Sequence, residues 1–293
     1  MSAVRHHFVP QGFLRGFASD DDSSKSFVWV YEKGAGRAPR KKSVRSIAWA
    51  PAYYAQERED GTEDLDSIET GLAQTIDNRI PVILKGIQPK PGEKVFVSEE
   101  DRAALSFFIG LSLTRVPSFR DGINDMYSQV AQFGLAQLAM EDSTSADLIE
   151  KYGVKATAKP WVSLRPMIEV AKAIADSALR KSWQFFLPPS EVPLATSDNP
   201  VVISGAAVGL PQLGPAHPGA ELVINLRKDL ALVCTPKRGY PSMQVFSLSS
   251  SDARKFNRGI VRAARQRVFA NHESSTFDRF VKKYADEEQR VIV

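Results

Sequence analysis

The sequence has only one cysteine, Cys234, among 293 residues. A single cysteine cannot form a disulfide within the chain, which excludes a small disulfide-stapled secreted domain. Cys234 follows four aliphatic residues, and a buried thiol is the simplest interpretation. No apolar run reaches the roughly 20 residues of a membrane-spanning helix, and the N-terminus lacks the apolar core of a signal peptide. We therefore expect a cytoplasmic protein with no membrane partner.

The sequence also lacks the familiar local signatures of catalysis. His-Glu-x-x-His, Gly-x-Ser-x-Gly, a phosphate-loop glycine pattern and a Cys-x-x-Cys pair are all missing. The net charge of +4 is mild, and 43% hydrophobic with 25% charged residues is typical of a globular protein. There is no internal repeat and no low-complexity tract, so we expect a single domain over residues 1–293.

Hydrophobic periodicity predicts four parts in this domain. They are an extended motif with strands at 1–55, a helical part at 64–182, a strand-rich part at 183–248, and helices at 250–285. The individual helices are expected at 64–79, 98–116, 119–140, 164–181, 250–268 and 275–285, with Pro81 ending or kinking the first. Grouped strands after grouped helices favour an α+β fold, in which a helical layer packs on a largely antiparallel sheet as a single globular unit.

The N-terminal segment contains the first candidate site residues. Half of the four histidines are adjacent, at His6 and His7, and Gln11 follows shortly after them. Successive side chains of an extended segment point to opposite sides. One histidine can therefore enter a site while the other stays outside.

Charged and polar side chains also interrupt patterns that are otherwise apolar. Glu69 falls in the middle of the apolar face predicted for the helix at 64–79, and Arg115 is the only charge within 103–116. Asn257 aligns with apolar residues on one face of the helix at 250–268. A buried charge is costly unless it is paired, hydrogen-bonded or bound to a cation. Glu69 and Arg115 therefore need partners.

A further polar insertion, Thr196-Ser197-Asp198-Asn199-Pro200, separates two strand-forming runs. Pro200 restricts Asn199 to extended or turn conformations, and short polar side chains readily bond nearby backbone. One interpretation is a local turn without a function. The other is that the turn directs Asp198 into the same polar pocket as His7 and Glu69.

A positive stripe is predicted near the C-terminus. Four arginines recur at intervals of four, four and three with no acid among them, namely Arg254, Arg258, Arg262 and Arg265. On a helix this spacing aligns them on one face. Such a ridge can neutralise phosphates of a polyanion, or it can be a solvated outer face.

Three motifs together resemble a known family. They are His6-His7-Phe8-Val9-Pro10-Gln11 with Phe13-Leu14-Arg15 and Phe17, then Thr114-Arg115-Val116-Pro117, and then Thr196-Ser197-Asp198-Asn199-Pro200. In this order they resemble the domain-of-unknown-function family 4238 over most of the chain. Gly12 is a departure from the family that the chain resembles, in which Gln-Phe-Tyr-Leu-Arg is more often found at this place. The family is uncharacterised, so the resemblance implies a shared pocket and supplies no reaction.

The candidate residues suit chemistry on a phosphoester. A neutral imidazole and two carboxylates can hold a divalent cation while an arginine stabilises a developing anion. We therefore expect an intracellular hydrolase of a small-molecule or polyanionic phosphoester, with nucleic acid as one candidate. Its catalytic residues would be His7, Glu69, Arg115 and Asp198, and its cation ligands His7, Glu69 and Asp198. The additional binding residues would be His6, Gln11, Asn199, Asn257, Arg254, Arg258, Arg262 and Arg265.

Two alternatives remain open at this point. Without a metal, the same four groups could act as a base, its orienting acid and an anion clamp. The protein could also be a non-enzymatic module that binds a small anion or nucleic acid, with the polar cluster a structural network. His217 and His272, in predicted loops, could approach the pocket in either case. Convergence of the catalytic candidates beside an open cleft would favour an enzyme.

Overall fold

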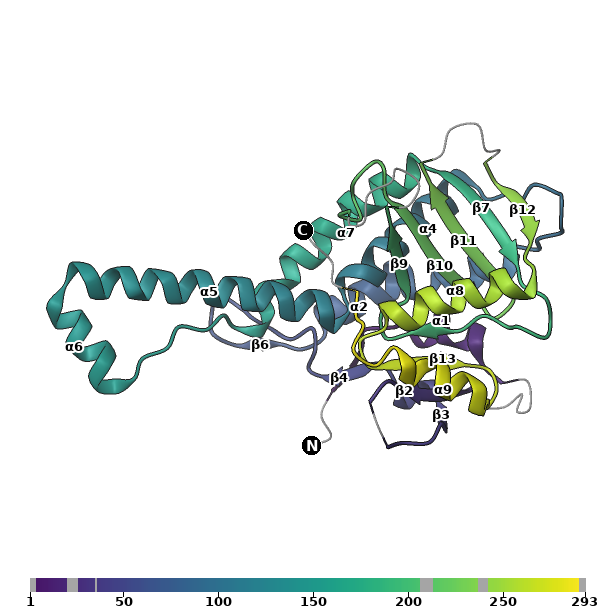
Figure 1. Cartoon of the computed structure of the whole chain (residues 1–293). Coiled ribbons are helices and arrows are strands. Elements are labelled where there is room, and N and C mark those ends of the chain that lie inside the picture. Colours follow the sequence, from purple (N-terminus) through teal and green to yellow (C-terminus); the bar gives the residue numbers. More distant parts are fainter. Residues whose placement is uncertain (1–3, 20–25, 35, 206–212, 237–241, 290–293) are drawn as a thin grey trace.

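Two sheets, one largely and one wholly antiparallel, organise the chain, which we describe from a computed structural model covering residues 4–19, 26–34, 36–205, 213–236 and 242–289 (Figure 1). The larger sheet has the strand order β12-β7-β11-β10-β9. Its neighbours pair antiparallel except β12 and β7, which are parallel. The strands are β7 (Ser182–Leu187), β9 (Val201–Ser204), β10 (Glu221–Arg227), β11 (Leu230–Thr235) and β12 (Gln244–Ser247).

The second sheet joins strands from three distant parts of the chain, in the order β3-β2-β13-β8. These strands are β2 (Phe27–Glu32), β3 (Arg40–Ser43), β8 (Thr196–Ser197) and β13 (Arg267–Ala270), and all of their pairings are antiparallel. Two small ladders accompany the sheets. One pairs β1 (Arg5–His7) with β4 (Trp49–Pro51), and the other pairs β5 (Gln56–Glu57) with β6 (Glu63–Asp64).

The helices lie mostly between residues 67 and 179 and again after residue 250. The α-helices are α1 (Gln11–Leu14), α2 (Ser67–Leu72), α3 (Arg79–Gly86), α4 (Glu99–Thr114), α5 (Pro117–Glu141), α6 (Ser143–Tyr152), α7 (Leu164–Leu179), α8 (Ser250–Ala263) and α9 (Ser275–Lys283). A π-helical turn, Ala73–Asp77, joins α2 to α3, and short 3-10 turns occupy Arg15–Phe17, Val44–Ser46 and Pro160–Ser163. Helices combined with largely antiparallel sheets confirm the α+β prediction.

Helix α4 forms the centre of the helical layer. The backbone N–H of Asp101 donates to Ser98 Oγ at 3.1 Å, the capping interaction that the sequence predicts at this N-terminus. Its apolar side chains are buried on nearly every side, as expected for a helix that is apolar all round. A Cβ placed on Gly110 would lie 2.2 Å from the carbonyl oxygen of Ala171. Only glycine therefore allows α4 and α7 to approach this closely.

Helix α5 leaves the body of the protein and carries α6 at its far end (Figure 1). Only Phe119, Arg120 and Ile123 of α5 are buried, and no described residue of α6 is. Arg120 anchors the root of α5, since Nε donates to Ser163 Oγ and Nη2 to the carbonyl of Pro160, both at 2.9 Å. Among the described residues, no helix is long and apolar enough to cross a membrane.

Three element predictions need correction. Pro81 lies in the first turn of α3 instead of ending a helix, where a missing N–H costs little. Residues 141–160, for which we expected no individual helix between those at 119–140 and 164–181, contain α6. The helix expected at 250–268 ends at Ala263, and Arg267–Ala270 is the strand β13. The arginine stripe is therefore broken, because Arg265 is not on the helix.

Candidate functional site

The two adjacent histidines are both buried, so neither stays outside. In β1, His6 is fully buried and His7 is 9% exposed. His6 Nδ1 accepts the backbone N–H of Tyr54 at 2.9 Å, and the two rings stack with centroids 5.6 Å apart. Burial lowers the pKa of both histidines. His6 is therefore a neutral group that helps to fix the chain after β4.

His7 lies beside Glu69, as the sequence predicts. The backbone N–H of His7 donates to Glu69 Oε1 at 3.5 Å, and the Tyr54 hydroxyl donates to the carbonyl of His7 at 3.1 Å. Gln11 Nε2 and His7 Nδ1 are 3.5 Å apart, a long contact at the limit of a hydrogen bond. Glu69 comes from α2, one turn before the π-helical turn, so β1 and α2 position this pair.

Arg115 pairs with Asp77, a residue that the sequence analysis missed. Arg115 is fully buried, and its Nη1 lies 2.9 and 3.2 Å from the two carboxylate oxygens of Asp77. Burial is the largest single influence and lowers the pKa of Arg115, but Asp77, Tyr54 and Glu69 together outweigh it, so the arginine pKa is raised. Asp77 is the last residue of the π-helical turn, which rotates it relative to the regular helix assumed from the sequence.

Several polar atoms in this region are buried without a hydrogen-bond partner among the described residues. They are His7 Nε2, Glu69 Oε2 and the Nε and Nη2 atoms of Arg115. Burial raises the pKa of Glu69 to about 7, opposed by the N–H of His7 and by Arg115. The structure thus brings His7, Glu69, Arg115 and Asp77 into one ionisable cluster, with a carboxyl that titrates near neutral pH.

Asp198 belongs to a different part of the molecule. Its carboxylate accepts three backbone N–H groups, from Arg265 at 2.8 Å and from Gln266 and Arg267 at 2.9 Å each. Burial raises the pKa of Asp198, and these three bonds act in the opposite direction. Its oxygens are therefore used to hold the turn between α8 and β13, and they do not join His7 and Glu69.

Asn199 and Lys33 complete this second polar region. Asn199 Nδ2 donates to the carbonyl of Ala263 at 3.1 Å, and the ammonium of Lys33 donates to that of Ala264 at 2.7 Å. Lys33 was also missed, because a lysine at a strand end usually reaches solvent, whereas here it is 2% exposed. Within the described part of the chain, no group of three or more His, Cys, Asp or Glu could hold a metal ion. The three predicted cation ligands, His7, Glu69 and Asp198, do not form such a group.

Asn257 and two of the predicted arginines line a cavity between α8 and α9. Asn257 Oδ1 accepts the N–H of Ala195 at 2.9 Å, and its Nδ2 donates to the carbonyl of Pro193 at 3.0 Å. The cavity has a volume of about 360 Å³. Its lining includes Arg254, Arg258, Asn257, His272, Phe277 and Phe280. His272 lines this cavity, which is not the pocket expected around His7 and Glu69.

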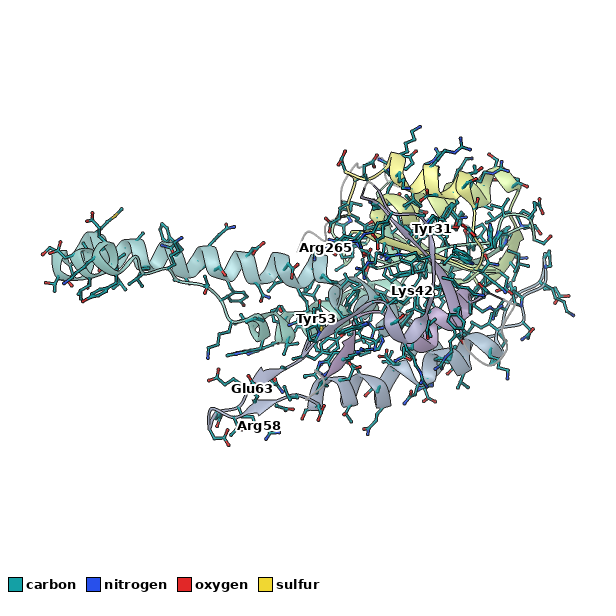
Figure 2. All side chains as sticks on the ribbon, turned by 90° about the horizontal axis from the view of Figure 1, so that it is seen from below. Tyr31, Lys42, Tyr53, Arg58, Glu63 and Arg265 are labelled. Carbon is teal, nitrogen blue, oxygen red and sulfur yellow. The ribbon has the colours of Figure 1, made fainter. Side chains whose placement is uncertain are left out.

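The other two arginines have partners elsewhere. Arg262 forms an ion pair with Glu287, and Arg265 forms one with Asp121 of α5 at 2.6 Å. Figure 2 shows Arg265 and Tyr53 where α5 leaves the body. His217 Nδ1 accepts the N–H of Gly219 at 3.0 Å within its own loop.

Two further cavities lie near Gly12 and near Trp161, and none of the three cavities is lined by His7, Glu69, Arg115 or Asp198.

The fold and these sites define an α+β protein with a buried ionisable cluster at its N-terminal motif and a separate cationic cavity near its C-terminus. The chain belongs to the family described as protein of unknown function (DUF4238), whose model matches residues 5–274. The predicted family resemblance is therefore confirmed over nearly the whole chain. No curated protein and no solved structure matches the sequence.

Proposed function

We propose that this protein is a binding module for a small organic anion, held in the cavity between α8 and α9. The observation that carries the proposal is the pairing of a cationic rim with an apolar wall. Arg254 and Arg258 are one helical turn apart on α8 and both are exposed, while Phe277 and Phe280 of α9 line the same cavity. A few polar groups set in an apolar concave surface are typical of small-molecule sites.

The cavity chemistry favours a phosphate or carboxylate attached to an aromatic or aliphatic group. Two guanidinium groups can bind such an anion with charge-assisted hydrogen bonds, and His272 and Asn257 add polar groups beside them. Glu191 also lines the cavity, but its carboxylate accepts the Ser250 hydroxyl at 2.8 Å. Two cations therefore oppose one carboxylate that already has a partner.

Calorimetric titration with phenyl phosphate tests this proposal, with inorganic phosphate and benzyl alcohol as probes of each half of the ligand. The double variant Arg254→Gln/Arg258→Gln should weaken binding of phenyl phosphate at least tenfold. Arg262→Gln is the matched control, because Arg262 lies on the same helix outside the cavity and should leave the affinity unchanged. Absence of phenyl phosphate binding at millimolar concentration, or equal loss in both variants, would contradict the proposal.

Nucleic acid is the alternative polyanionic ligand of this surface. Binding through phosphates weakens linearly with the logarithm of salt concentration, with a slope set by the number of phosphates neutralised. Only Arg254 and Arg258 of the predicted four remain without an ion pair among the described residues. We therefore expect a single-stranded oligonucleotide to bind weakly, with a slope of about −1.4 for two phosphates at about −0.7 each. A slope of about −2.8 would instead indicate that all four arginines take part.

A second candidate function is hydrolysis of a phosphoester at the N-terminal cluster. It is favoured by the Glu69 carboxyl, whose pKa of about 7 suits a general acid at neutral pH. In this mechanism water attacks the phosphorus while His7 takes its proton, Glu69 gives a proton to the leaving oxygen, and Arg115 stabilises the developing anion. Asp198 has no role in it, because its oxygens hold the 265–267 turn.

A colorimetric phosphoester assay supplemented with divalent cations tests this second candidate. Turnover of bis(p-nitrophenyl) phosphate by the wild type should fall as the pH rises above about 7, where Glu69 loses its proton, and Glu69→Gln should abolish the turnover. Arg254→Gln/Arg258→Gln should leave that turnover unchanged, so the two candidate functions are separable. We also propose a cytoplasmic location, because a single buried cysteine, Cys234, fits a compartment in which thiols stay reduced.

A further inference from the structure

The arginine of the N-terminal motif, residues 6–17, is not explained by packing. Phe13, Leu14 and Phe17 of this motif are each exposed by 1% or less, so the core accounts for them. Arg15 lies between them in sequence and is exposed. It forms no ion pair in the part of the chain that the structure describes. An exposed arginine is ordinary by itself, so the surroundings of Arg15 decide whether it can bind a ligand.

Arg15 lines a cavity of about 460 Å³ between the N-terminal motif, α3 and the turn that joins β10 to β11. We call it the motif cavity. Its other charged lining residues are Lys85 of α3, Arg227 at the end of β10 and Asp229 in the turn. Lys85 is exposed and, like Arg15, pairs with no acid in the described ranges. Three cations from three separate elements therefore line one concave surface that contains a single carboxylate.

The guanidinium of Arg227 is held by contacts on two of its three nitrogens. Nε donates to Asp229 Oδ1 at 2.9 Å, and Nη1 donates to the carbonyls of Leu84 and Ile87, the second at 3.2 Å. These carbonyls lie at the C-terminus of α3, whose partial negative charge would otherwise repel an anion. Nη2 has no hydrogen-bond partner in the described segments, and it is not one of the unpartnered atoms sealed from solvent. Arg227 therefore keeps one nitrogen available to a ligand.

Close packing fixes the walls of the motif cavity. A Cβ on Gly12 would lie 2.5 Å from Pro81 Cγ, and a Cβ on Gly16 would lie 3.3 Å from the carbonyl oxygen of Leu226. The N–H of Lys228 donates to the carbonyl of Gly16 at 2.9 Å. The two glycines thus allow the motif to lie directly against α3 and against the end of β10. A site assembled in this way loses little conformational freedom on binding, which favours affinity.

We propose that the motif cavity binds a compact anion with several negative charges, of the chemical class of a diphosphate. Three cations against one carboxylate leave two positive charges in the lining, and that carboxylate already accepts Nε of Arg227. Arg227 binds one phosphate through Nη2, and the exposed Arg15 and Lys85 bind the other. Charge-assisted hydrogen bonds of this kind are the strong ones, and arginine suits the geometry of phosphate oxygens. An anion with a single charge would leave part of this positive charge unmatched.

The lining distinguishes this ligand from the one proposed for the cavity between α8 and α9. That cavity has Phe277 and Phe280 in its wall, both half-buried. In the motif cavity, Phe13 and Leu84 are only 1% and 4% exposed, so they offer little apolar surface to a ligand. Recognition therefore depends on charge and hydrogen bonds, and an aromatic group on the ligand adds little. This inference does not rest on the proposed function.

Calorimetric titration of the full chain with pyrophosphate tests the proposal, with inorganic phosphate as the probe of lower charge. Pyrophosphate should bind at least tenfold more tightly than inorganic phosphate, because two phosphates can meet all three cations. Arg15→Gln/Lys85→Gln should weaken pyrophosphate binding at least tenfold, and it should fold normally because both residues are exposed. Lys172→Gln/Arg180→Gln is the matched control. It removes one lysine and one arginine charge from exposed positions outside the motif cavity and should leave the affinity unchanged.

Three results of this titration would overturn the proposal. They are the absence of pyrophosphate binding at millimolar concentration, an equal loss in the two double variants, and an affinity no higher than that for inorganic phosphate. Arg254→Gln/Arg258→Gln, in the cavity between α8 and α9, should bind pyrophosphate as the wild type does. A loss of binding in that variant alone would place the anion there and would also overturn the motif cavity as its site.

Arg227→Lys tests the role of the held guanidinium. Lysine keeps the positive charge, but an ammonium on a flexible stem does not reproduce the fixed fork that contacts Asp229, α3 and the ligand together. Arg227→Lys should therefore weaken pyrophosphate binding at least tenfold, with circular dichroism to verify that the variant is folded. A folded variant with wild-type affinity would overturn the role of Nη2. If the variant does not fold, the exposed pair Arg15 and Lys85 decides the proposal.

Discussion

Replacing Glu69 by glutamine should stabilise the protein at alkaline pH and have little effect at acidic pH. The Glu69 carboxyl has a pKa near 7 in the folded chain, against 4.5 for a free glutamate, because burial disfavours its charge. Between these values the folded state binds more protons than the unfolded state. The free energy of unfolding that Glu69 contributes therefore falls as the pH rises from 4.5 to 7.

The size of the effect follows from the same two values. Each factor of ten in the ionisation equilibrium corresponds to about 1.4 kcal/mol, so the full change from 4.5 to about 7 sets an upper limit of about 3 kcal/mol. Glu69 is only partly buried, and solvent screening reduces this to about 1–2 kcal/mol. Glu69→Gln removes the charge while it keeps an oxygen that can accept the His7 N–H.

Urea unfolding at pH 5 and pH 8 measures this difference. The free energy of unfolding of Glu69→Gln should exceed that of the wild type by about 1–2 kcal/mol at pH 8 and by much less at pH 5. The histidines have the opposite dependence, since burial lowers their pKa and stability is lost as the pH falls below 6.5, but they are common to both proteins. Glu59→Gln, in an exposed loop, is the control and should leave the free energy of unfolding unchanged at both pH values. A stabilisation of equal size at both pH values would refute the reasoning.

Two further substitutions test the structural roles of named residues. Asp198→Asn should lower the free energy of unfolding in urea by about 2–4 kcal/mol, because an amide cannot accept all three N–H groups of 265–267 that the carboxylate accepts. A decrease below about 0.5 kcal/mol would show that Asp198 has no such structural role. Gly110→Ala should lower the free energy of unfolding by about 3 kcal/mol and so lower the melting temperature, since its Cβ would lie 2.2 Å from the Ala171 carbonyl oxygen. Gly134→Ala is the control, because Gly134 has open space around it, and should not lower the melting temperature.

Local signals predicted the elements that depend on nearby residues. The Ser98 cap and the apolar sequence after it identified α4, and β-branched runs identified β10 and β11. The end of α8 could not be predicted in this way. Arg265 and Val268 continue the helical spacing, but Asp198, more than sixty residues earlier, captures the N–H groups that a longer helix would use. A contact so distant in sequence has no signature in local periodicity.

The candidate site was predictable only in part, for a related reason. Burial patterns correctly indicated that Glu69 and Arg115 need partners, and His7 was correctly placed beside Glu69. The partner of Arg115 was missed because the π-helical turn at Ala73–Asp77 changes the register of Asp77. Asp198 was grouped with His7 and Glu69 on residue type alone, and residue type does not specify which of several buried donors a carboxylate will meet.

The β3-β2-β13-β8 sheet makes the two ends of the chain depend on each other during folding. Strand β2 finds its neighbour β13 more than 230 residues later, as in the pair Tyr31 and Val268. Closing so long a loop is slow, because its conformational entropy is lost before the contacts between the two strands can stabilise the chain. We expect this sheet to form late, so a nascent chain still missing its last thirty residues would leave β2 with an open edge, available to other chains emerging beside it.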